Sequence, residues 1–391
     1  MNADELKAAI GRFVDEKADE IERLSLAIHE AAELGLEEHR SCDMLTKFLS
    51  KHGMQTECGT GGLPTAFKAT FYGNSNKPVV AFLAEYDALP VVGHACGHNI
   101  IGASAAASGA ALASLGSSLP GCALVFGTPA EENAGGKVVM TRAGVFEGVD
   151  AVFMNHPGSG ESKMGGSSLA IHSFAIRYKG KPAHAAGSPH EGVNALDAAC
   201  IFLHAVGLLR QHVSSDVRLH GIITKGGDAT NIIPEFTEVR YLARAPRRSD
   251  LDRVAEKVRG CIRAGCEATG CTVEITETKN YEPVKPNKVL AEVLCSNYIR
   301  AGFPMSTEMS HAKGSTDLGE VSQVVPQANS KVRIAPESVV GHSHEFALAS
   351  ASPEGRAALL ASAKAMAWSA IDVMTDPGLL KAAWEEFNST E

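Results

Sequence analysis

Residues 77–99 read KPVVAFLAEYDALPVVGHACGHN, and this stretch decides both the fold class and the chemistry that we expect of the chain. Its first part, KPVVAFLAEYD, is a continuous apolar run of the kind that forms a strand buried on both faces of a parallel sheet. Its second part is a glycine-containing loop in which Cys96 stands between His94 and His98. The stretch therefore predicts a core strand that leads into a reactive loop.

Two further apolar runs of the same kind follow, GCALVFGTPAEE at 121–132 and VDAVFMNHPG at 149–158. Helix-like segments at 99–115 and 136–144 separate the three runs, and this β-α-β-α-β order predicts a mostly parallel sheet. The runs end on polar side chains, namely Asp87, the pair Glu131 and Glu132, and His156. Because the carboxyl ends of the strands of an open α/β sheet line one crevice, we expect these side chains to lie close together.

The remaining pattern predicts two domains, as does the length of 391 residues. Residues 1–52 are typical of amphipathic helices. From about residue 168 the chain alternates, with strand-like SSLAIHSFAIRYKG, EFTEVRYLARA and CTVEITET and two long amphipathic helices between them. We predict an α/β domain of residues 1–167 and 283–391, interrupted at 168–282 by a four-stranded sheet that carries two helices on one face.

Composition excludes several classes of partner. A net charge of −9 argues against nucleic-acid binding and disfavours docking on anionic membranes. The opening residues MNADELKAAIGRF do not have the pattern of a signal peptide, and the small-residue run at 100–116 is shorter than a bilayer requires. Nine cysteines, an odd number scattered from Cys42 to Cys295, suit a reducing compartment. We expect a cytoplasmic protein in which Cys96 forms no disulfide.

Cys96 and His98 are candidate metal ligands, because a thiolate and an imidazole two residues apart in a loop can converge on one cation and Zn²⁺ accepts both. An isolated pair of this kind is more often a buried thiol beside a surface histidine. The other donors expected at neighbouring strand ends make the metal site the favoured interpretation.

Glu131 and Glu132 indicate the same chemistry. Adjacent carboxylates in one crevice repel each other, and a divalent cation offsets that repulsion. One carboxylate can then bind metal while the other serves as a general base. A solvated acidic loop and a structural histidine at His156 are the alternatives. In VVGHSHEF, either His342 or His344 could supply the last donor, and spacing alone does not decide between them.

A family resemblance rests on blocks that run in order along the chain: EYDALP…GHACGHN, GTPAEENAGG, MNHPG, GKPAHAAGSPHEGVNALDA, GGDATNIIPE, GSTDLGEVSQVVP and GHSHEF. From about His29 to about Phe346 these blocks resemble the aminoacylase and carboxypeptidase-G superfamily of metal-dependent amidohydrolases. The most similar branch holds aminoacylase-like dipeptidases, aminobenzoyl-glutamate hydrolases and indole-acetyl-amino-acid hydrolases. The resemblance implies a catalytic α/β domain with an inserted ferredoxin-like α+β domain that serves as lid and dimerisation unit.

The resemblance also implies the composition of the metal site. Two divalent ions per chain, Zn²⁺ or Mn²⁺ with Co²⁺ as a further option, are expected to be bound by Cys96, His98, Glu132, His156 and His342. His342 is chosen because the family ligand precedes a phenylalanine, here Phe346, by four residues.

Other residues receive roles from the same resemblance. Glu131 would be the general base, and Asp87 an acid that orients the site without binding metal. His184 would reach the active site of the partner subunit in a homodimer and stabilise the oxyanion. Asn231 and Arg244 would hold the amide and carboxylate groups of the substrate. Without the resemblance, His184 would be taken for a solvent-exposed loop histidine.

The expected function is hydrolysis of the amide bond of a small N-acyl amino acid or dipeptide with a free carboxylate. Glu131 would take a proton from a metal-bound water and pass it to the leaving amine. A metal-loaded binding or regulatory protein is the first alternative. A Cys96 nucleophile would leave the glutamate pair and His156 without a role. A dinucleotide-dependent oxidoreductase lacks the expected G-x-G-x-x-G after the first strand.

Two positions depart from the family pattern. Ala32 stands where the branch usually has proline, and His29 and Glu33 beside it are kept. Thr316–Asp317 replaces a common Glu–Asp pair, which resembles the dipeptidase-like subgroup and disfavours auxin conjugates as substrates.

Overall fold

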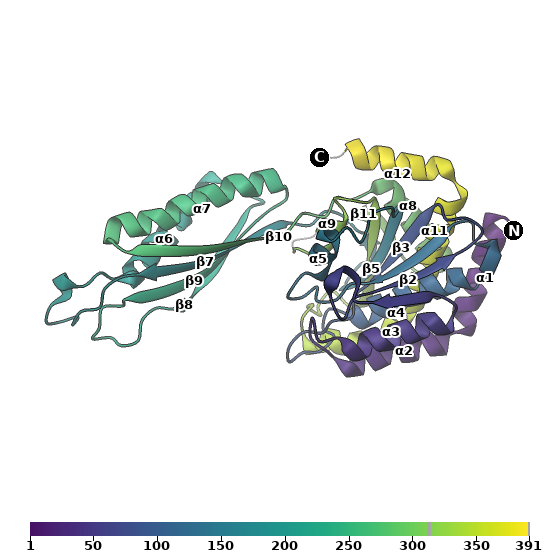
Figure 1. The fold of residues 1–391 in the computed structure, drawn as a ribbon, viewed down its shortest axis with the longest axis horizontal. Helices are drawn as coiled ribbons and strands as arrows, with labels where there is room; N and C mark the ends of the chain where they lie inside the picture. Colours follow the sequence, from purple (N-terminus) through teal and green to yellow (C-terminus); the bar gives the residue numbers. More distant parts are fainter. Residues whose placement is uncertain (311–313, 390–391) are drawn as a thin grey trace. The chain divides into compact units, whose positions relative to one another are not determined.

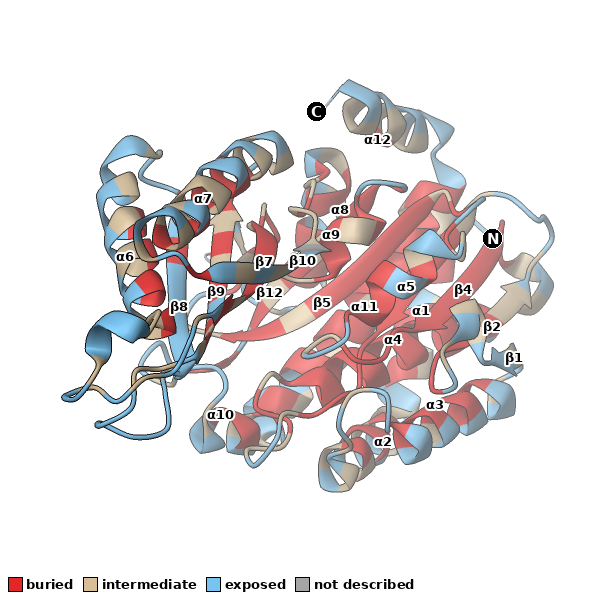
Figure 2. Ribbon diagram, turned by 60° about the vertical axis from the view of Figure 1, so that its left-hand side comes forward, coloured by how far each residue is buried: buried red, intermediate tan, exposed pale blue. Residues whose placement is uncertain are grey.

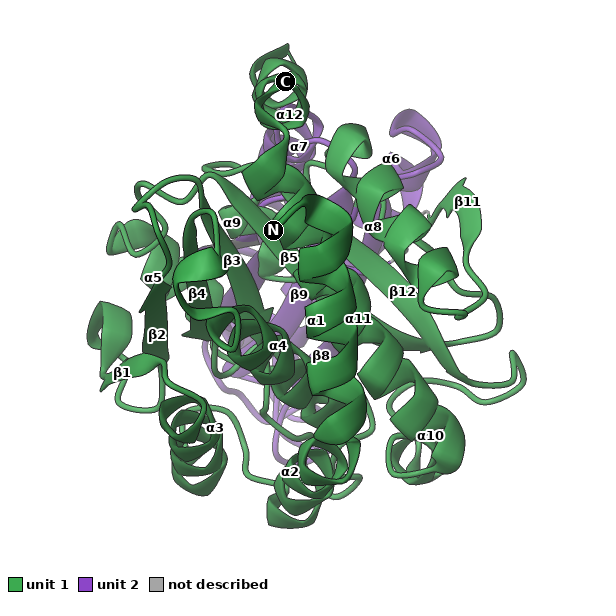
Figure 3. Cartoon of the chain, turned by 90° about the vertical axis from the view of Figure 1, so that its right-hand side faces the viewer, with its two compact units in different colours: residues 1–167, 284–312, 316–391 green, residues 168–283, 313–315 purple. Residues whose placement is uncertain are grey.

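The computed structural model describes residues 1–310 and 314–389 (Figure 1). The chain forms two compact units (Figure 3). The larger unit comprises Met1–Ser167, Val284–Ala312 and Thr316–Glu391, and the smaller comprises Ser168–Pro283 and Lys313–Ser315. The smaller unit is thus inserted into the chain of the larger one.

The three apolar runs form neighbouring parallel strands in the larger unit. They are β3 (Val79–Ala84), β4 (Cys122–Gly127) and β5 (Ala151–Ser159), and they stand in the order β4-β3-β5. Val80 and Phe82 belong to one apolar core, whereas Ala81 and Leu83 belong to a second core on the other face. Both faces of these strands are buried, which explains why the runs are continuous rather than alternating. The predicted α/β class with a mostly parallel sheet is confirmed.

Five strands without a long apolar run complete an eight-stranded sheet of order β1-β2-β4-β3-β5-β12-β6-β11. They are β1 (Gln55–Cys58), β2 (Phe67–Tyr72), β6 (Lys163–Met164), β11 (Ser306–Met309) and β12 (Gln327–Ala335). β12 lies parallel to β5 and pairs Lys331 with His156. Strands that precede and follow the smaller unit in the chain are therefore neighbours in one sheet.

Helices cover both faces of this sheet. One core receives side chains from α1 (Ala3–Glu16), α2 (Ala18–Ala31), α3 (His39–Lys51), α4 (His98–Ala113), α8 (Lys288–Arg300), α11 (Pro353–Thr375) and α12 (Pro377–Ser389). The other core includes α5 (Gly136–Arg142) and α9 (Leu318–Val321). Figure 2 shows α4 and the central strands as buried, with exposed outer faces on α2 and α3.

Two apolar helices of the larger unit, α4 and α11, are buried inside it. Every residue of α4, which carries most of the small-residue run, is buried. Among the described residues, α11 is long and apolar enough to cross a membrane, but 78% of its apolar window is buried inside the structure, as in the core helix of a globular unit.

The residue after α2 is Ala32, which stands where the family branch usually has proline. Its φ is 42°, a value that proline cannot adopt, so the backbone conformation at this position requires a residue other than proline.

The smaller unit has the order β7 (Ala170–Lys179), α6 (Ala195–Leu209), β8 (Arg218–Lys225), β9 (Phe236–Ala245), α7 (Arg248–Thr269) and β10 (Thr272–Tyr281). Its antiparallel sheet has the order β10-β7-β9-β8, which is the ferredoxin-like arrangement that the resemblance implied. Phe174 and Tyr241 of the sheet share a core with Phe202 of α6 and Val258 of α7. The sequence patterns named three of the four strands. β8 was not predicted from these patterns, because it is an edge strand whose side chains are mostly exposed.

Candidate metal centre

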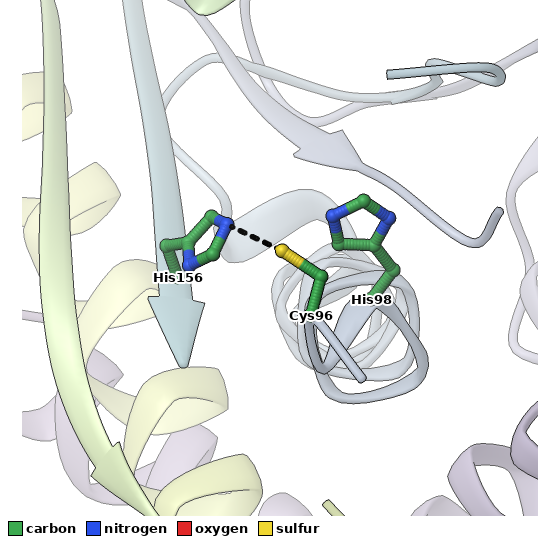
Figure 4. Close-up of side chains that lie close together, drawn as sticks. All are labelled: Cys96, His98 and His156. Atoms are coloured by element: carbon green, nitrogen blue, oxygen red, sulfur yellow. Dashed lines mark hydrogen bonds between the residues drawn. The ribbon is translucent and has the colours of Figure 1, made fainter. Parts of the chain in front are cut away.

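Side chains that could bind a metal ion converge from five segments of the larger unit. Within each of four groups the donor atoms lie within 4.8 Å of one another: Cys96–His98–His156, Cys96–Glu132–His342, His98–Glu131–Glu132, and Glu85–Glu131–Asp317. The first three groups share members and contain all five ligands that the resemblance implied, together with Glu131. Figure 4 shows Cys96 between His156 of β5 and His98 at the start of α4.

The Cys96 loop reaches His156 because of the glycine between Cys96 and His98. Gly97 has φ +80°, and a Cβ atom there would lie 2.7 Å from a side-chain carbon of Pro157. Glycine alone combines this backbone conformation with this close approach. The sulfur of Cys96 consequently lies 3.5 Å from Nε2 of His156, whose Nδ1 donates to the Pro157 carbonyl (2.7 Å). Both Sγ and Nε2 therefore face the cluster.

Asp87 holds two members of the cluster in place. His98 Nδ1 donates to the carbonyl oxygen of Asp87 at 2.9 Å and to its Oδ1 at 3.0 Å. The other carboxylate oxygen of Asp87 accepts the backbone N–H of Glu132 at 3.0 Å. Burial opposes the charge on Asp87, but the neighbouring His98 outweighs it and the pKa of Asp87 is lowered. The contacts fix the ring of His98 so that Nε2 points into the cluster.

The glutamate pair lies on the loop between β4 and α5, and the turn before it has a special backbone conformation. Ala130 has φ 62°, and its N–H donates to Oε1 of Glu38 at 2.8 Å. Glu132 Oε1 lies 3.9 Å from Nε2 of His98 and 3.6 Å from Nε2 of His342. Glu38, which is fully buried, follows the family positions His29 and Glu33 closely, but it was not predicted as a site residue because no local pattern marks it as buried.

His342, rather than His344, reaches the cluster. His342 has φ 63°, and its N–H donates to the carbonyl oxygen of Ala95 at 2.9 Å, next to Cys96. His344 begins α10 (His344–Ala349) and belongs to none of the four groups found among the described residues. Left-handed backbone at residues other than glycine is costly and clusters at functional sites.

The electrostatics of the cluster suit a cation. Burial raises the pKa of the Cys96 thiol to about 12. Burial also opposes a charge on His98, yet Cys96, Asp87 and Glu85 together raise the pKa of this imidazole well above its usual value. The pKa of Glu131 is raised well above its ordinary value by burial and by the carboxylates of Glu85 and Asp317. Negative groups thus repel one another at a place where a positive charge would be stabilised.

Buried atoms without hydrogen bonds also indicate a cation. In the described part of the chain, three buried atoms of the cluster make no hydrogen bond, namely Nε2 of His98, Oε1 of Glu132 and Oε2 of Glu85. Buried polar atoms without partners are expensive, and all three are good ligands for a divalent metal ion. The residues therefore fit a metal centre. A Cys96 nucleophile fits less well, because a thiol with a pKa of about 12 is not ionised near neutral pH.

A buried ion-pair network beside the cluster was missed in the sequence. Nζ of Lys137, in the first turn of α5, lies 2.5 Å from Glu85 Oε1 and 2.6 Å from Asp317 Oδ1. All three side chains are 0% exposed. Glu85 carried a signal, since it precedes Asp87 by two residues in the same strand-end motif. Lys137 carried none, because a lysine in a helix is usually exposed.

The three remaining candidate residues lie in the smaller unit. Nδ1 of the exposed His184 accepts the N–H groups of Ala186 (3.2 Å) and Gly187 (3.0 Å), which leaves Nε2 as the donor. The exposed Asn231 contacts the same loop, since its backbone carbonyl oxygen accepts the backbone N–H of Ala185 at 2.9 Å.

Arg244 on β9 is half-buried and lies in the same unit. Its Nη1 donates to Ser315 Oγ at 3.2 Å, whereas its buried Nε has no hydrogen-bond partner among the described residues. Burial lowers the pKa of this guanidinium.

An α/β unit with a cysteine, histidine and carboxylate cluster at its strand ends, interrupted by a ferredoxin-like unit, defines a class of metal-dependent hydrolase. Comparison with known proteins narrows that class. Residues 81–365 match the model of peptidase family M20/M25/M40. The chain is 40% identical to Xaa-Arg dipeptidase of Mus musculus over 98% of this chain and 92% of that protein.

Two further relatives agree. A p-aminobenzoyl-glutamate hydrolase chain of Escherichia coli is 33% identical over 78% of this chain and 68% of that protein. In fold, the chain resembles a dinuclear metal-binding M20 peptidase of Bacillus subtilis, with TM-score 0.70, 20% identity and coverage of 94% and 99%. The chain belongs to peptidase family M20/M25/M40. The predicted superfamily branch and the predicted class of enzyme, a metal-dependent amidohydrolase or dipeptidase, are confirmed.

Proposed function

We propose that the chain hydrolyses dipeptides or N-acyl amino acids with a free carboxylate at a site that binds two divalent ions. The observation that carries the proposal is the sharing of Glu132 between groups. Glu132 lies with Cys96 and His342 in one group and with His98 and Glu131 in another. Five donors exceed what one four-coordinate ion needs, so a shared carboxylate supports a pair of ions.

The ligands in this proposal are Cys96, His98, Glu132, His156 and His342. When bound, the ions supply Lewis-acid activation of a water molecule and of the substrate carbonyl. A mixed set of sulfur, nitrogen and oxygen donors suits Zn²⁺, while Mn²⁺ or Co²⁺ would also be accepted. Cys96 binds as a thiolate and gives up its proton on metal binding.

Glu131 is the general base in this mechanism. It accepts a proton from the attacking water and later donates it to the leaving amine. Its neighbours support this role, because a carboxylate whose pKa is raised by burial, Glu85 and Asp317 holds a proton more readily than an exposed one. Asp87 orients His98 and the loop of Glu132 and touches no substrate.

The residues that we propose as substrate-binding groups belong to the smaller unit. The tautomer of His184, with its proton on Nε2, is suited to donate a hydrogen bond to an oxyanion. Arg244 is proposed to bind the substrate carboxylate, because its half-buried guanidinium retains an Nε–H without a hydrogen-bond partner in the described chain. Asn231 is proposed to bind the amide group.

The relatives suggest which substrates to try first. The Mus musculus relative is named for cleaving Xaa-Arg dipeptides, and at 40% identity over nearly the whole chain it is the natural guide. We therefore propose dipeptides with a basic C-terminal residue as the leading substrates. Acylated glutamates, as the Escherichia coli relative's name indicates, are the second choice.

A homodimer formed through β8 is part of the proposal. β8 is the edge of its sheet, and Ile222 on it is 65% exposed. An exposed apolar edge strand readily pairs with a second copy. Ile222→Lys is expected to convert the dimer to a monomer, measured as mass by light scattering. Ile299→Lys, at a 54% exposed isoleucine of α8, is the matched control and should leave the mass unchanged. A wild-type monomer would refute this part.

A cytoplasmic location is also proposed. None of the nine cysteines, all of which lie in the described ranges, forms a disulfide. Unpaired thiols in this number suit a reducing compartment. Cell fractionation tests this, and recovery of the protein in an oxidising compartment would contradict it.

The function is tested by elemental analysis of the purified protein together with a panel of dipeptides and N-acyl amino acids. The expected result is two metal ions per chain and hydrolysis that is lost on chelation and regained with Zn²⁺ or Mn²⁺. Two bound ions without hydrolysis of any member of the panel would favour a binding or regulatory protein instead.

A further inference from the structure

The network of Glu85, Lys137 and Asp317 enters the mechanism above only through the pKa of Glu131, yet it is among the most buried sets of charges in the larger unit. Lys137 donates to Glu85 through Nζ (2.5 Å) and to both oxygens of Asp317, through Nζ (2.6 Å) and through its backbone N–H (3.0 Å). Three charges without solvent need a strong reason to be kept, because burying them is costly.

The two carboxylates differ in what their oxygens contact. Both oxygens of Asp317 accept hydrogen bonds from Lys137. Glu85 gives only Oε1 to Lys137, while its Oε2 is buried and makes no hydrogen bond in the described part of the chain. One oxygen of Glu85 is thus left over.

The spare oxygen of Glu85 is directed at the metal cluster. Oε2 lies 3.4 Å from Nε2 of His98, which also makes no hydrogen bond. Because Nδ1 of His98 donates to Asp87, the proton that the ring loses on metal binding leaves from Nε2, which then presents its lone pair toward the same point. A buried carboxylate oxygen and an imidazole nitrogen that face each other at 3.4 Å are arranged to bind one cation once the nitrogen has released its proton.

We propose that Glu85 is an additional ligand of the metal ion that His98 binds, and that Lys137 is the positioning residue that presents it. Lys137 neutralises Oε1 and fixes the side chain, so that Oε2 alone is available to the ion. This inference rests on the proposed metal centre and enlarges its ligand set.

The test compares Glu85→Gln with Asp317→Asn. Each variant removes one negative partner of Lys137, but only the first removes an oxygen directed at His98. Metal-free protein is titrated with Zn²⁺ against a competing chelator dye. We expect Glu85→Gln to weaken the affinity of one of the two sites by about 10- to 100-fold, and Asp317→Asn to keep both affinities near those of the wild type.

Folding is checked on the metal-free proteins by circular dichroism. If Glu85→Gln does not fold, Glu85→Asp takes its place, because it keeps a negative charge beside Lys137 while both carboxylate oxygens withdraw by one methylene group. It is expected to lose affinity in the same direction.

Two results would overturn the inference. One is wild-type Zn²⁺ affinity at both sites in the folded Glu85 variant, and the other is an equal loss in Asp317→Asn, which would make the effect one of charge balance. Failure of the wild-type protein to bind two ions would instead count against the proposed metal centre itself.

Discussion

The two units hold their candidate functional residues in different ways. In the larger unit His98 and Asp87 are at most 1% exposed and hydrogen-bonded to each other, and Glu132 is held by the same carboxylate. In the smaller unit His184 and Asn231 are exposed and are held mainly through their loop backbone. Buried polar groups must find partners as the chain folds, so their geometry is set by the fold. The geometry of an exposed group is instead set by the ligand or partner that binds it.

The largest effect should come from the buried region. Glu131→Gln is expected to lower kcat by about 100- to 10,000-fold, because the amide cannot take a proton from water. Elemental analysis should still find the wild-type metal content. Glu147→Gln, at an exposed acid of the same unit, is the control and should have wild-type kcat. Loss of metal in Glu131→Gln would indicate that Glu131 is a metal ligand and not the general base.

The exposed region should give the next largest effect. His184→Ala is expected to reduce kcat by about 100- to 1,000-fold with a small change in KM, since an oxyanion donor acts mainly in the transition state. His190→Ala, at an exposed histidine of the same segment, should behave as the wild type. Equal activity of the two variants would leave His184 as an ordinary surface histidine.

Arg244 should affect binding rather than turnover. Arg244→Met is expected to raise KM by about 10- to 100-fold, the size of a lost hydrogen bond to a charged group. Steady-state kinetics on a dipeptide and on its C-terminal amide separates the roles, because the amide lacks the carboxylate and should lose little in the variant. Arg240→Met, on the same strand and paired with Glu238, is the comparison variant. A similar loss with both substrates would argue against carboxylate binding.

A pH dependence of metal binding is also expected. Cys96, with a pKa of about 12, and His98, with a pKa well above its usual value, both hold protons at neutral pH and must release them to bind metal. Zn²⁺ affinity should therefore rise with pH, by about tenfold per pH unit for each proton released. The pKa of His156 is lowered by burial, so it contributes no proton.

Titration of metal-free protein between pH 6 and 8, as roughly the range over which zinc-site protons are released, measures this slope. Cys96→Ala should reduce it by one proton. A pH-independent affinity in the wild type would show that the thiol is already ionised.

The sequence predicted the buried region well for a physical reason. Short continuous apolar runs bounded by turn residues are typical of core strands, and parallel strands bring the residues after them to one edge, so Asp87, Glu132 and His156 could be grouped from the sequence alone. His342 could be selected over His344 only by resemblance, because its place depends on a left-handed turn at the residue itself. Lys137 and Glu38 could not be found, since nothing local distinguishes a buried charge from an exposed one.

The smaller unit was predicted less completely. Its helices and three of its strands follow from periodicity, but β8 has an exposed pattern that does not alternate. His184, Asn231 and Arg244 were named only through the family resemblance. An exposed side chain on a loop or sheet leaves no packing pattern in the sequence from which its role could be read.

The pairing of β5 with β12 has a consequence for how the protein is made. All residues of the smaller unit and β11 leave the ribosome between these two strands, so the central sheet stays open until residues 327–335 have emerged. Three of the proposed ligands, Cys96, Glu132 and His156, are synthesised before this interval. His342 is synthesised only after β12. With the proposed ligand set, capture of the full complement of metal belongs to the last stage of biosynthesis, when His342 has been synthesised.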